Sequence, residues 1–209
     1  MSVVTVPKDL DQDYLREEIK KEYRVVAANP EQGFHFHTGR KLAGIVEYQE
    51  DWLSAVPAGV LASFAGTGCP FRMGELSPGE RVADLGCGAG IDSFIAANQV
   101  GPEGKVVGVD MTEEMLAKGE AAREQAAGEK GGLAQLEFRQ GVFEDLPIED
   151  GWAGVVISNG SINLCPDKMQ AFGEIFRILK PGGRFQMADI LVNKPVSEAA
   201  KQNIDLWTG

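Results

Sequence analysis

Short runs of β-branched residues alternate with helical patterns from about residue 80 onward, and this order limits the possible folds more than any other feature of the chain. The runs predict strands at residues 81–85, 105–109, 136–139, 155–158 and 185–191. Helical patterns between them predict helices at residues 91–100, 112–127 and 167–179. Parallel strands require such crossovers. The order therefore predicts a doubly wound α/β core with a mostly parallel sheet that is covered on both faces.

Two of the predicted helices carry clear local signals. Thr112 is expected to be the N-cap of the second helix, because acidic residues follow it in the first turn. In the third helix, four apolar residues fall on one face, which we expect to pack on the sheet: Met169, Phe172, Phe176 and Leu179. In a fold of this kind ligands bind beyond the carboxyl ends of the strands, so the residues that follow each strand are the candidates for a site.

Residues 1–75 follow a different pattern and are interpreted as an N-terminal helical cap on a core of residues 76–209. Leu15, Ile19 and Tyr23 line one face of a charged first helix. His35 and His37 would project to one side of an extended segment, so they are candidates for a substrate pocket. A surface or packing role is the favoured alternative for them, and no third ligand at a suitable spacing supports a metal site. The cap itself could serve only to pack against the outer face of the core.

The composition excludes several classes of partner. Lys plus Arg number 20 and Asp plus Glu number 31 among the 209 residues, which gives a formal net charge of −11. Such a chain repels polyphosphate and anionic lipid, so we expect neither a nucleic acid nor a membrane partner. No apolar run approaches the ~20 residues of a membrane span, and no signal-peptide pattern begins the chain. The three cysteines show no metal-ligand spacing, and the chain is expected to be cytoplasmic.

A glycine-rich loop follows the first predicted strand. The residues from Asp84 to Gly90 read Asp-Leu-Gly-Cys-Gly-Ala-Gly, and the second strand ends at Asp110. Glycines let the backbone approach a ligand closely, and a carboxylate at the end of the second strand can accept both ribose hydroxyls. Ile91 stands where a dinucleotide site has its third glycine, and Asp84 suits an ammonium group better than a pyrophosphate. The pattern therefore favours S-adenosylmethionine over NAD.

Residues 75–192 resemble the class I S-adenosylmethionine-dependent methyltransferases, through the motifs at residues 82–90, 110–116, 144–147 and 179–184. Within that class, residues 108–112 and 158–168 are most similar to the arsenite methyltransferase group and its relatives, whose sister group methylates quinone rings. The resemblance implies that Asp110 binds the ribose, the loop glycines bind the methionine portion, and Asp84 binds its ammonium group. The full set of cofactor-binding residues that it implies is Asp84, Gly86, Cys87, Gly88, Gly90, Asp110, Met111, Val142, Phe143, Asn159 and Gly160.

The sequence departs from the arsenite group at the cysteines that the resemblance implies. Trivalent arsenic prefers soft thiolate ligands. The positions at which relatives carry cysteines are Gly160 and Thr67 here, with Cys69 two residues later, and a third would follow Gly209. Cys87 and Cys165 are interpreted as small packing residues. Arsenite is therefore not predicted as the acceptor, and a metalloid, a quinone-like ring and other small molecules all remain open.

The expected function is in-line methyl transfer from S-adenosylmethionine to a small-molecule acceptor, with S-adenosylhomocysteine as product. No general base is required, and if one acts, the candidates are His35, His37 and Asp189. Two alternatives stay open: a module that binds the cofactor without turnover, and a nicotinamide-dependent oxidoreductase. The first predicts affinity without methyl transfer, whereas the second predicts binding of NADH.

The resemblance also implies seven strands, of which the sequence accounts for five. The last two strands are thus expected to be missing, which leaves an uncovered sheet edge. One hypothesis is that the native product continues past Gly209. The alternatives are that the N-terminal segment covers this edge, or that a second copy does so in a homodimer.

Overall fold

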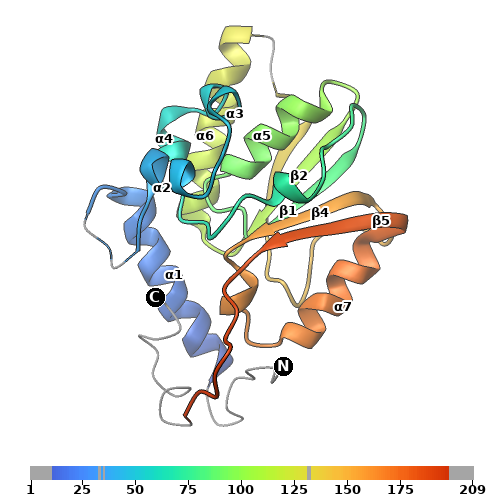
Figure 1. Cartoon of the computed structure of the whole chain (residues 1–209). Helices are drawn as coiled ribbons and strands as arrows, with labels where there is room; N and C mark the ends of the chain where they lie inside the picture. Colours follow the sequence, from blue (N-terminus) through green and yellow to red (C-terminus); the bar gives the residue numbers. More distant parts are fainter. Residues whose placement is uncertain (1–10, 33, 35, 131–132, 198–209) are drawn as a thin grey trace.

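The computed structural model describes residues 11–32, 34, 36–130 and 133–197, and its centre is a parallel β-sheet (Figure 1). Five strands pair in the order β3-β2-β1-β4-β5, and every pairing is parallel. The predicted α/β fold is therefore confirmed, and so are four of the five predicted strands to within two residues at either end. The strands are β1 (Arg81–Leu85), β2 (Lys105–Asp110), β3 (Leu136–Gln140), β4 (Ala153–Asn159) and β5 (Leu179–Ala188).

Three helices cross over between the strands, as the alternating pattern predicts. They are α5 (Ile91–Val100), α6 (Glu113–Lys130) and α7 (Lys168–Ile178). Figure 1 shows α5 and α6 on one face of the sheet and α7 on the other. The chain adds β2 and β3 on one side of β1, and β4 and β5 on the other. The strand order therefore reverses between β1 and β4, and a crevice opens beyond the carboxyl ends of these two strands.

The two faces of the sheet bury separate hydrophobic clusters, because successive side chains of a strand point to opposite faces. Ala83, Leu85, Val107 and Val156 belong to the cluster beneath α7. The neighbouring strand residues belong to a larger cluster on the side of α5, and this cluster includes Val82, Val106, Leu136, Val155 and Ile157.

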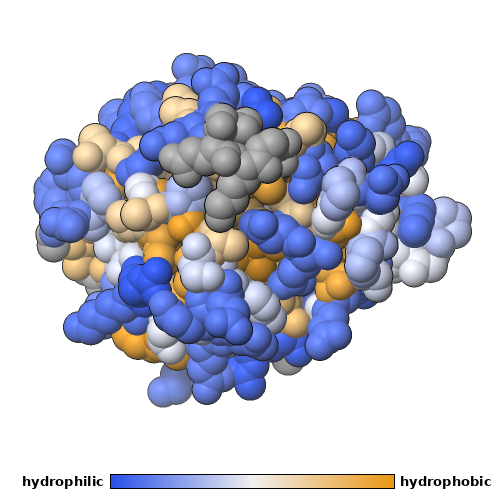
Figure 2. Space-filling view, turned by 90° about the horizontal axis from the view of Figure 1, so that it is seen from above, coloured by the Kyte–Doolittle hydropathy of each residue, from blue (hydrophilic) through white to orange (hydrophobic). Residues whose placement is uncertain are grey.

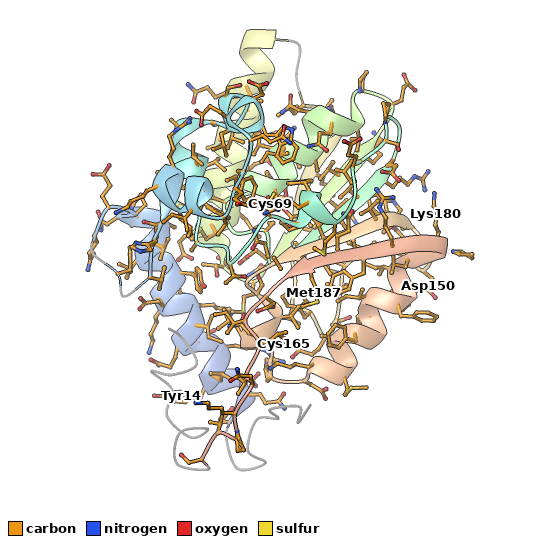
Figure 3. All side chains as sticks on the ribbon, in the orientation of Figure 1. Tyr14, Cys69, Asp150, Cys165, Lys180 and Met187 are labelled. Carbon is orange, nitrogen blue, oxygen red and sulfur yellow. The ribbon has the colours of Figure 1, made fainter. Side chains whose placement is uncertain are left out.

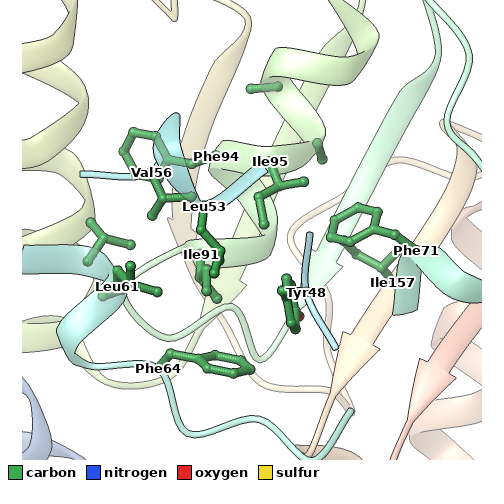
Figure 4. Packing of buried hydrophobic residues seen from close by; sticks show 14 of the residues in the cluster. Tyr48, Leu53, Val56, Leu61, Phe64, Phe71, Ile91, Phe94, Ile95 and Ile157 are labelled. Carbon is green, nitrogen blue, oxygen red and sulfur yellow. The ribbon is translucent and has the colours of Figure 1, made fainter. Parts of the chain in front are cut away.

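The N-terminal segment packs into the larger cluster. It forms α1 (Gln12–Ala28), α2 (Gly39–Ile45), α3 (Glu50–Ser54), α4 (Ala58–Ala62) and the 3-10 helix η1 (Pro70–Met73). Leu53, Phe64 and Phe71 from this segment pack with Phe94 and Ile157 of the sheet half (Figure 4). The interpretation of residues 1–75 as a cap, with a domain boundary at residue 75, stays a prediction.

The prediction of which face of α7 is buried is wrong. Met169 and Phe176 are 72% and 82% exposed, and Phe172 is also exposed. The helix instead buries Ala171, Ile175 and Ile178 against the sheet. Both sets repeat with helical spacing, so the pattern alone could not separate them, and the smaller set lets the helix approach the strands closely.

The limits of the last strand also differ from the expected residues 185–191. Leu179 already pairs with Ala153, directly after α7 ends at Ile178, and the strand ends at Ala188. Between this first pair and the pair of Arg184 with Val155 the register shifts. The irregularity falls on the sequence Lys-Pro-Gly-Gly, where proline removes an amide donor and Gly182 has φ +78°.

Within the described residues, β5 pairs with β4 alone, and pairing of its outer edge with a second copy stays a prediction. None of the described helices is both long and apolar enough to cross a membrane. The face seen from above in Figure 2 is largely hydrophilic, with hydrophobic residues in small patches between polar ones.

Candidate functional site

A cleft lies at the carboxyl ends of the strands and encloses about 1060 Å³ of space, open solvent at its mouth included. The β1–α5 loop, the ends of β2 and β4, residues 141–146 and helix α1 form its walls. All of the predicted cofactor-binding residues line this one cleft: Asp84, Gly86, Cys87, Gly88, Gly90, Asp110, Met111, Val142, Phe143, Asn159 and Gly160. This volume is slightly above the range of roughly 300–1,000 Å³ that is typical of small-molecule sites, because it includes open solvent.

The three loop positions favour glycine for different structural reasons. All three have positive φ angles, at +70° for Gly86, +54° for Gly88 and +98° for Gly90. A Cβ atom on Gly86 would collide with Ser161, and one on Gly90 would collide with Phe138. A Cβ atom on Gly88 would meet nothing within 4 Å. The backbone at Gly88 is therefore accessible, and a ligand could approach the loop closely at this position.

Asp110 joins the glycine loop to the start of α6. Its Oδ2 accepts a hydrogen bond from the Gly88 amide (2.9 Å), and its Oδ1 accepts one from the Thr112 amide (2.8 Å). Each carboxylate oxygen can accept a further bond. Burial raises the pKa of Asp110, while the amide donors oppose that shift. The residue is thus held in place with acceptor capacity left over at the cleft wall.

Two further carboxylates, Asp84 and Asp92, are more deeply buried than Asp110. Asp84 is 1% exposed and accepts a hydrogen bond from the Ser93 hydroxyl (2.5 Å). Burial, followed by the nearby charge of Asp92, raises its pKa well above the ordinary value. Asp92 is 3% exposed, and burial raises its pKa to about 6. The sequence analysis missed Asp92, although a carboxyl group two residues after the last loop glycine was a visible signal.

Asn159 is engaged in a network that ties the N-terminal segment to the sheet. Its Oδ1 accepts from the amides of Thr67 (2.9 Å) and Gly68 (3.1 Å). Its Nδ2 donates to the Tyr48 hydroxyl (2.9 Å) and to Asp92 (3.1 Å), and Tyr48 in turn donates to Asp92 (2.5 Å). The side-chain amide therefore already has protein partners, and its part in the cleft is to hold the loop at residues 67–68 against the end of β4.

Helix α1 closes the cleft on the opposite side. Arg16, Ile19 and Tyr23 line the cleft, although the sequence analysis placed two of them only on an apolar helix face. Arg16 pairs with Glu144 (3.3 Å). Burial, with a contribution from the charge of Asp110, raises the pKa of Tyr23 to about 12, so its hydroxyl stays protonated.

The candidate general bases do not gather at the cleft. His35 lies outside the described residues, and His37 is exposed and is not part of the cleft wall. Asp189 directly follows β5, where its carboxylate accepts from the amides of Asn163 (3.1 Å) and Ile190 (2.7 Å), and it does not line the cleft either. Their roles in catalysis stay predictions.

The three cysteines are buried and free. Cys87 and Cys165 line the cleft, whereas Cys69 does not, and Figure 3 shows Cys69 and Cys165 well apart. Burial raises the pKa of all three thiols, so they stay protonated at neutral pH. Thr67 and Gly160, where the resemblance implies cysteines, do meet: a Cβ atom on Gly160 would lie 3.0 Å from Thr67 Cγ2. In the described part of the chain, no three His, Cys, Asp or Glu side chains form a group that could hold a metal.

Residues 76–208 match a family model described as a methyltransferase domain. The chain belongs to this methyltransferase family. An arsenite methyltransferase of Halobacterium salinarum is 44% identical to it over 144 residues, which is 69% of this chain and 36% of that protein. A demethylmenaquinone methyltransferase of Lactococcus lactis is 38% identical over 136 residues, which is 65% of this chain and 51% of that protein.

A solved methyltransferase structure supports the same assignment. The arsenic(III) S-adenosylmethionine methyltransferase of Chlamydomonas reinhardtii superposes with a TM-score of 0.66 at 34% sequence identity. The match covers 74% of this methyltransferase chain and 53% of that one. The chain thus spans between about one third and one half of the length of these relatives.

Proposed function

We propose that this chain binds S-adenosylmethionine in the cleft and takes part in methyl transfer to a small-molecule acceptor, with S-adenosylhomocysteine as the product. The observation that carries the proposal is the accessible backbone at Gly88, where a Cβ atom would meet no protein atom within 4 Å. Asp84 and Asp110 line the same cleft. The relatives described above are methyltransferases, so neither a nicotinamide-dependent oxidoreductase nor a module without turnover gains support.

The residues present fit the cofactor. Asp110 would accept both ribose hydroxyls with the acceptor capacity that the Gly88 and Thr112 amides leave free. Asp84 would hold the ammonium group, and the loop backbone would lie along the methionine portion. The chemistry that the bound cofactor supplies is a methyl group on a positively charged sulfur, already activated for transfer.

The protein's contribution is then placement and exclusion of water. Transfer requires the acceptor atom roughly 3 Å from the methyl carbon and in line with the bond that breaks. The network around Asn159 fixes one wall of the cleft, and helix α1 covers the opposite side with Ile19 and Tyr23. A closed, largely apolar wall excludes competing water. The methyl-transfer step itself uses no protein base, and a proton that the methyl group replaces on a ring carbon or hydroxyl would leave to solvent afterwards.

The acceptor is proposed to be a small molecule that does not depend on a cluster of thiolates. Thr67 and Gly160, which stand where the resemblance implies cysteines, carry no thiol, and burial keeps Cys87 and Cys165 protonated. Phe64, Phe143 and Leu164 also line the cleft, and such side chains suit an apolar acceptor. A quinone-like ring therefore fits these residues better than a soft metalloid.

Calorimetric titration with S-adenosylhomocysteine tests the proposal. We expect saturable binding to the 209-residue chain, and we expect Asp110→Ala to weaken it by roughly 10- to 150-fold, because a hydrogen bond to a charged group contributes ~1.5–3 kcal/mol. NADH is the control ligand and should not bind. Binding of NADH alone would favour the oxidoreductase, and binding of neither ligand would overturn the proposal.

A further inference from the structure

The cleft contains three carboxylates that meet only neutral hydrogen-bond partners. Ser93 donates to Asp84, the hydroxyl of Tyr48 and the amide of Asn159 donate to Asp92, and backbone amides donate to Asp110. Arg16 is the one basic side chain on the cleft wall within the described residues. It already pairs with Asp13 and Glu144.

Such an arrangement is unfavourable without a ligand. Buried charges in proteins are normally paired with an opposite charge, because burial removes the stabilisation that water provides. The titratable groups that interact with Asp92 are Tyr48, Cys69, Asp84 and Cys87, and none of them is basic. In the described residues no basic side chain offsets the charge of Asp92, so a positive charge on the bound molecule would be attracted to it.

Two of the carboxylates have assigned partners under the proposed function, on which this inference rests. Asp110 faces the ribose and Asp84 faces the ammonium group, and S-adenosylmethionine shares both features with S-adenosylhomocysteine. Asp92 has no such partner. The two ligands differ in one charge, which is the positive charge on the sulfur of the methyl donor.

We propose that Asp92 is a specificity-determining residue whose fixed negative charge makes the cleft favour the methyl donor over the demethylated product. Tyr48 and Asn159 hold the carboxylate by both of its oxygens, so it acts by its charge at a set position. Loss of the methyl group removes the positive charge that this carboxylate attracts. The product is consequently held less tightly than the donor, which favours exchange after each transfer.

The test compares the affinities of the two ligands by calorimetry at pH 8, in wild type and in Asp92→Asn. Asp51→Asn is the matched control, because it removes the same charge from an exposed site outside the cleft. We expect Asp92→Asn to lower the ratio of donor affinity to product affinity by roughly 5-fold or more, the lower limit for neighbouring unit charges at the dielectric constant of water. The control should leave the ratio within about twofold of wild type.

A second variant tests the same residue through its protonation. Tyr48→Phe removes a donor that stabilises the charged form of Asp92, so the pKa of Asp92 should rise further. The pH at which the preference for the donor is lost should then move upward relative to wild type. Equal weakening of both ligands by Asp92→Asn, or an unchanged ratio, would overturn the inference. Failure of both ligands to bind wild type would instead overturn the proposed function.

Discussion

Replacing Gly88 by alanine tests whether a ligand approaches the backbone of the glycine loop. A Cβ atom at this position meets no protein atom within 4 Å, so the added methyl group clashes with nothing in the ligand-free protein. Gly79, in the turn before β1, has the same property and also a positive φ angle, but it lies outside the cleft. The two glycines therefore form a matched pair.

The expected magnitudes follow from this geometry. Each alanine variant should lose roughly 1–2 kcal/mol of folding free energy, because a side chain disfavours a left-handed backbone. In a chain of this size that loss lowers Tm by roughly 2–8 °C. Only Gly88→Ala should also lose affinity for S-adenosylhomocysteine, by roughly 5- to 150-fold, since a methyl group forced into a packed contact costs ~1–3 kcal/mol.

Thermal unfolding followed by fluorescence and calorimetric titration measure the two effects separately. Equal affinities of Gly88→Ala and Gly79→Ala for S-adenosylhomocysteine would refute the reasoning, because they would mean that no ligand lies against the loop at Gly88. A much larger fall in Tm for Gly88→Ala than for Gly79→Ala would also contradict it, since the space at both positions is open.

Two further predictions concern stability. Burial raises the pKa of Asp92 to about 6, so the free energy of unfolding of wild type should fall as the pH rises from about 4 to 6. Asp92→Asn lacks this titration. Its free energy of unfolding relative to that of wild type should therefore increase by roughly 1–3 kcal/mol from pH 4 to pH 8. Urea unfolding at both pH values checks this, and a difference independent of pH would contradict it. Lys118 donates to the carbonyl of Ala27 and to the hydroxyl of Ser63, both at 2.8 Å, so Lys118→Met should destabilise the protein by roughly 1–3 kcal/mol. The same urea assay applies, with the exposed Lys105→Met as control, and equal stabilities of the two variants would count against a role for Lys118 in fastening α1 to α6.

The glycine loop and its partners were predictable because their signals are local. Asp84, Gly88 and Asp110 lie at the ends of strands whose β-branched runs are plain in the sequence, and parallel strands bring such ends to one edge of the sheet. The face of α7 was not predictable in the same way. Phe176 and Ile175 are adjacent in sequence, so two helical stripes overlap, and only the packing of the sheet decides between them.

The network around Asn159 shows a second limit of sequence reasoning. Tyr48 and Asn159 are separated by 111 residues, and Tyr48 and Asp92 by 44. Nothing in a local pattern indicates that a tyrosine in the N-terminal segment will reach a carboxylate of α5. Such contacts follow from how the segment packs over the sheet, which is a property of the whole core.

The hydrophobic cluster that joins the N-terminal segment to the sheet sets the size of the unit that can be exchanged between proteins. The match to the family model begins at residue 76, whereas the shared cluster begins at Val26 and includes Phe64 and Phe71. A fragment cut at residue 76 would leave Phe94 and Ile157 without these partners. Any N-terminal segment grafted onto this cofactor half must therefore supply matching apolar side chains, so the unit that folds is larger than the part that the family model matches.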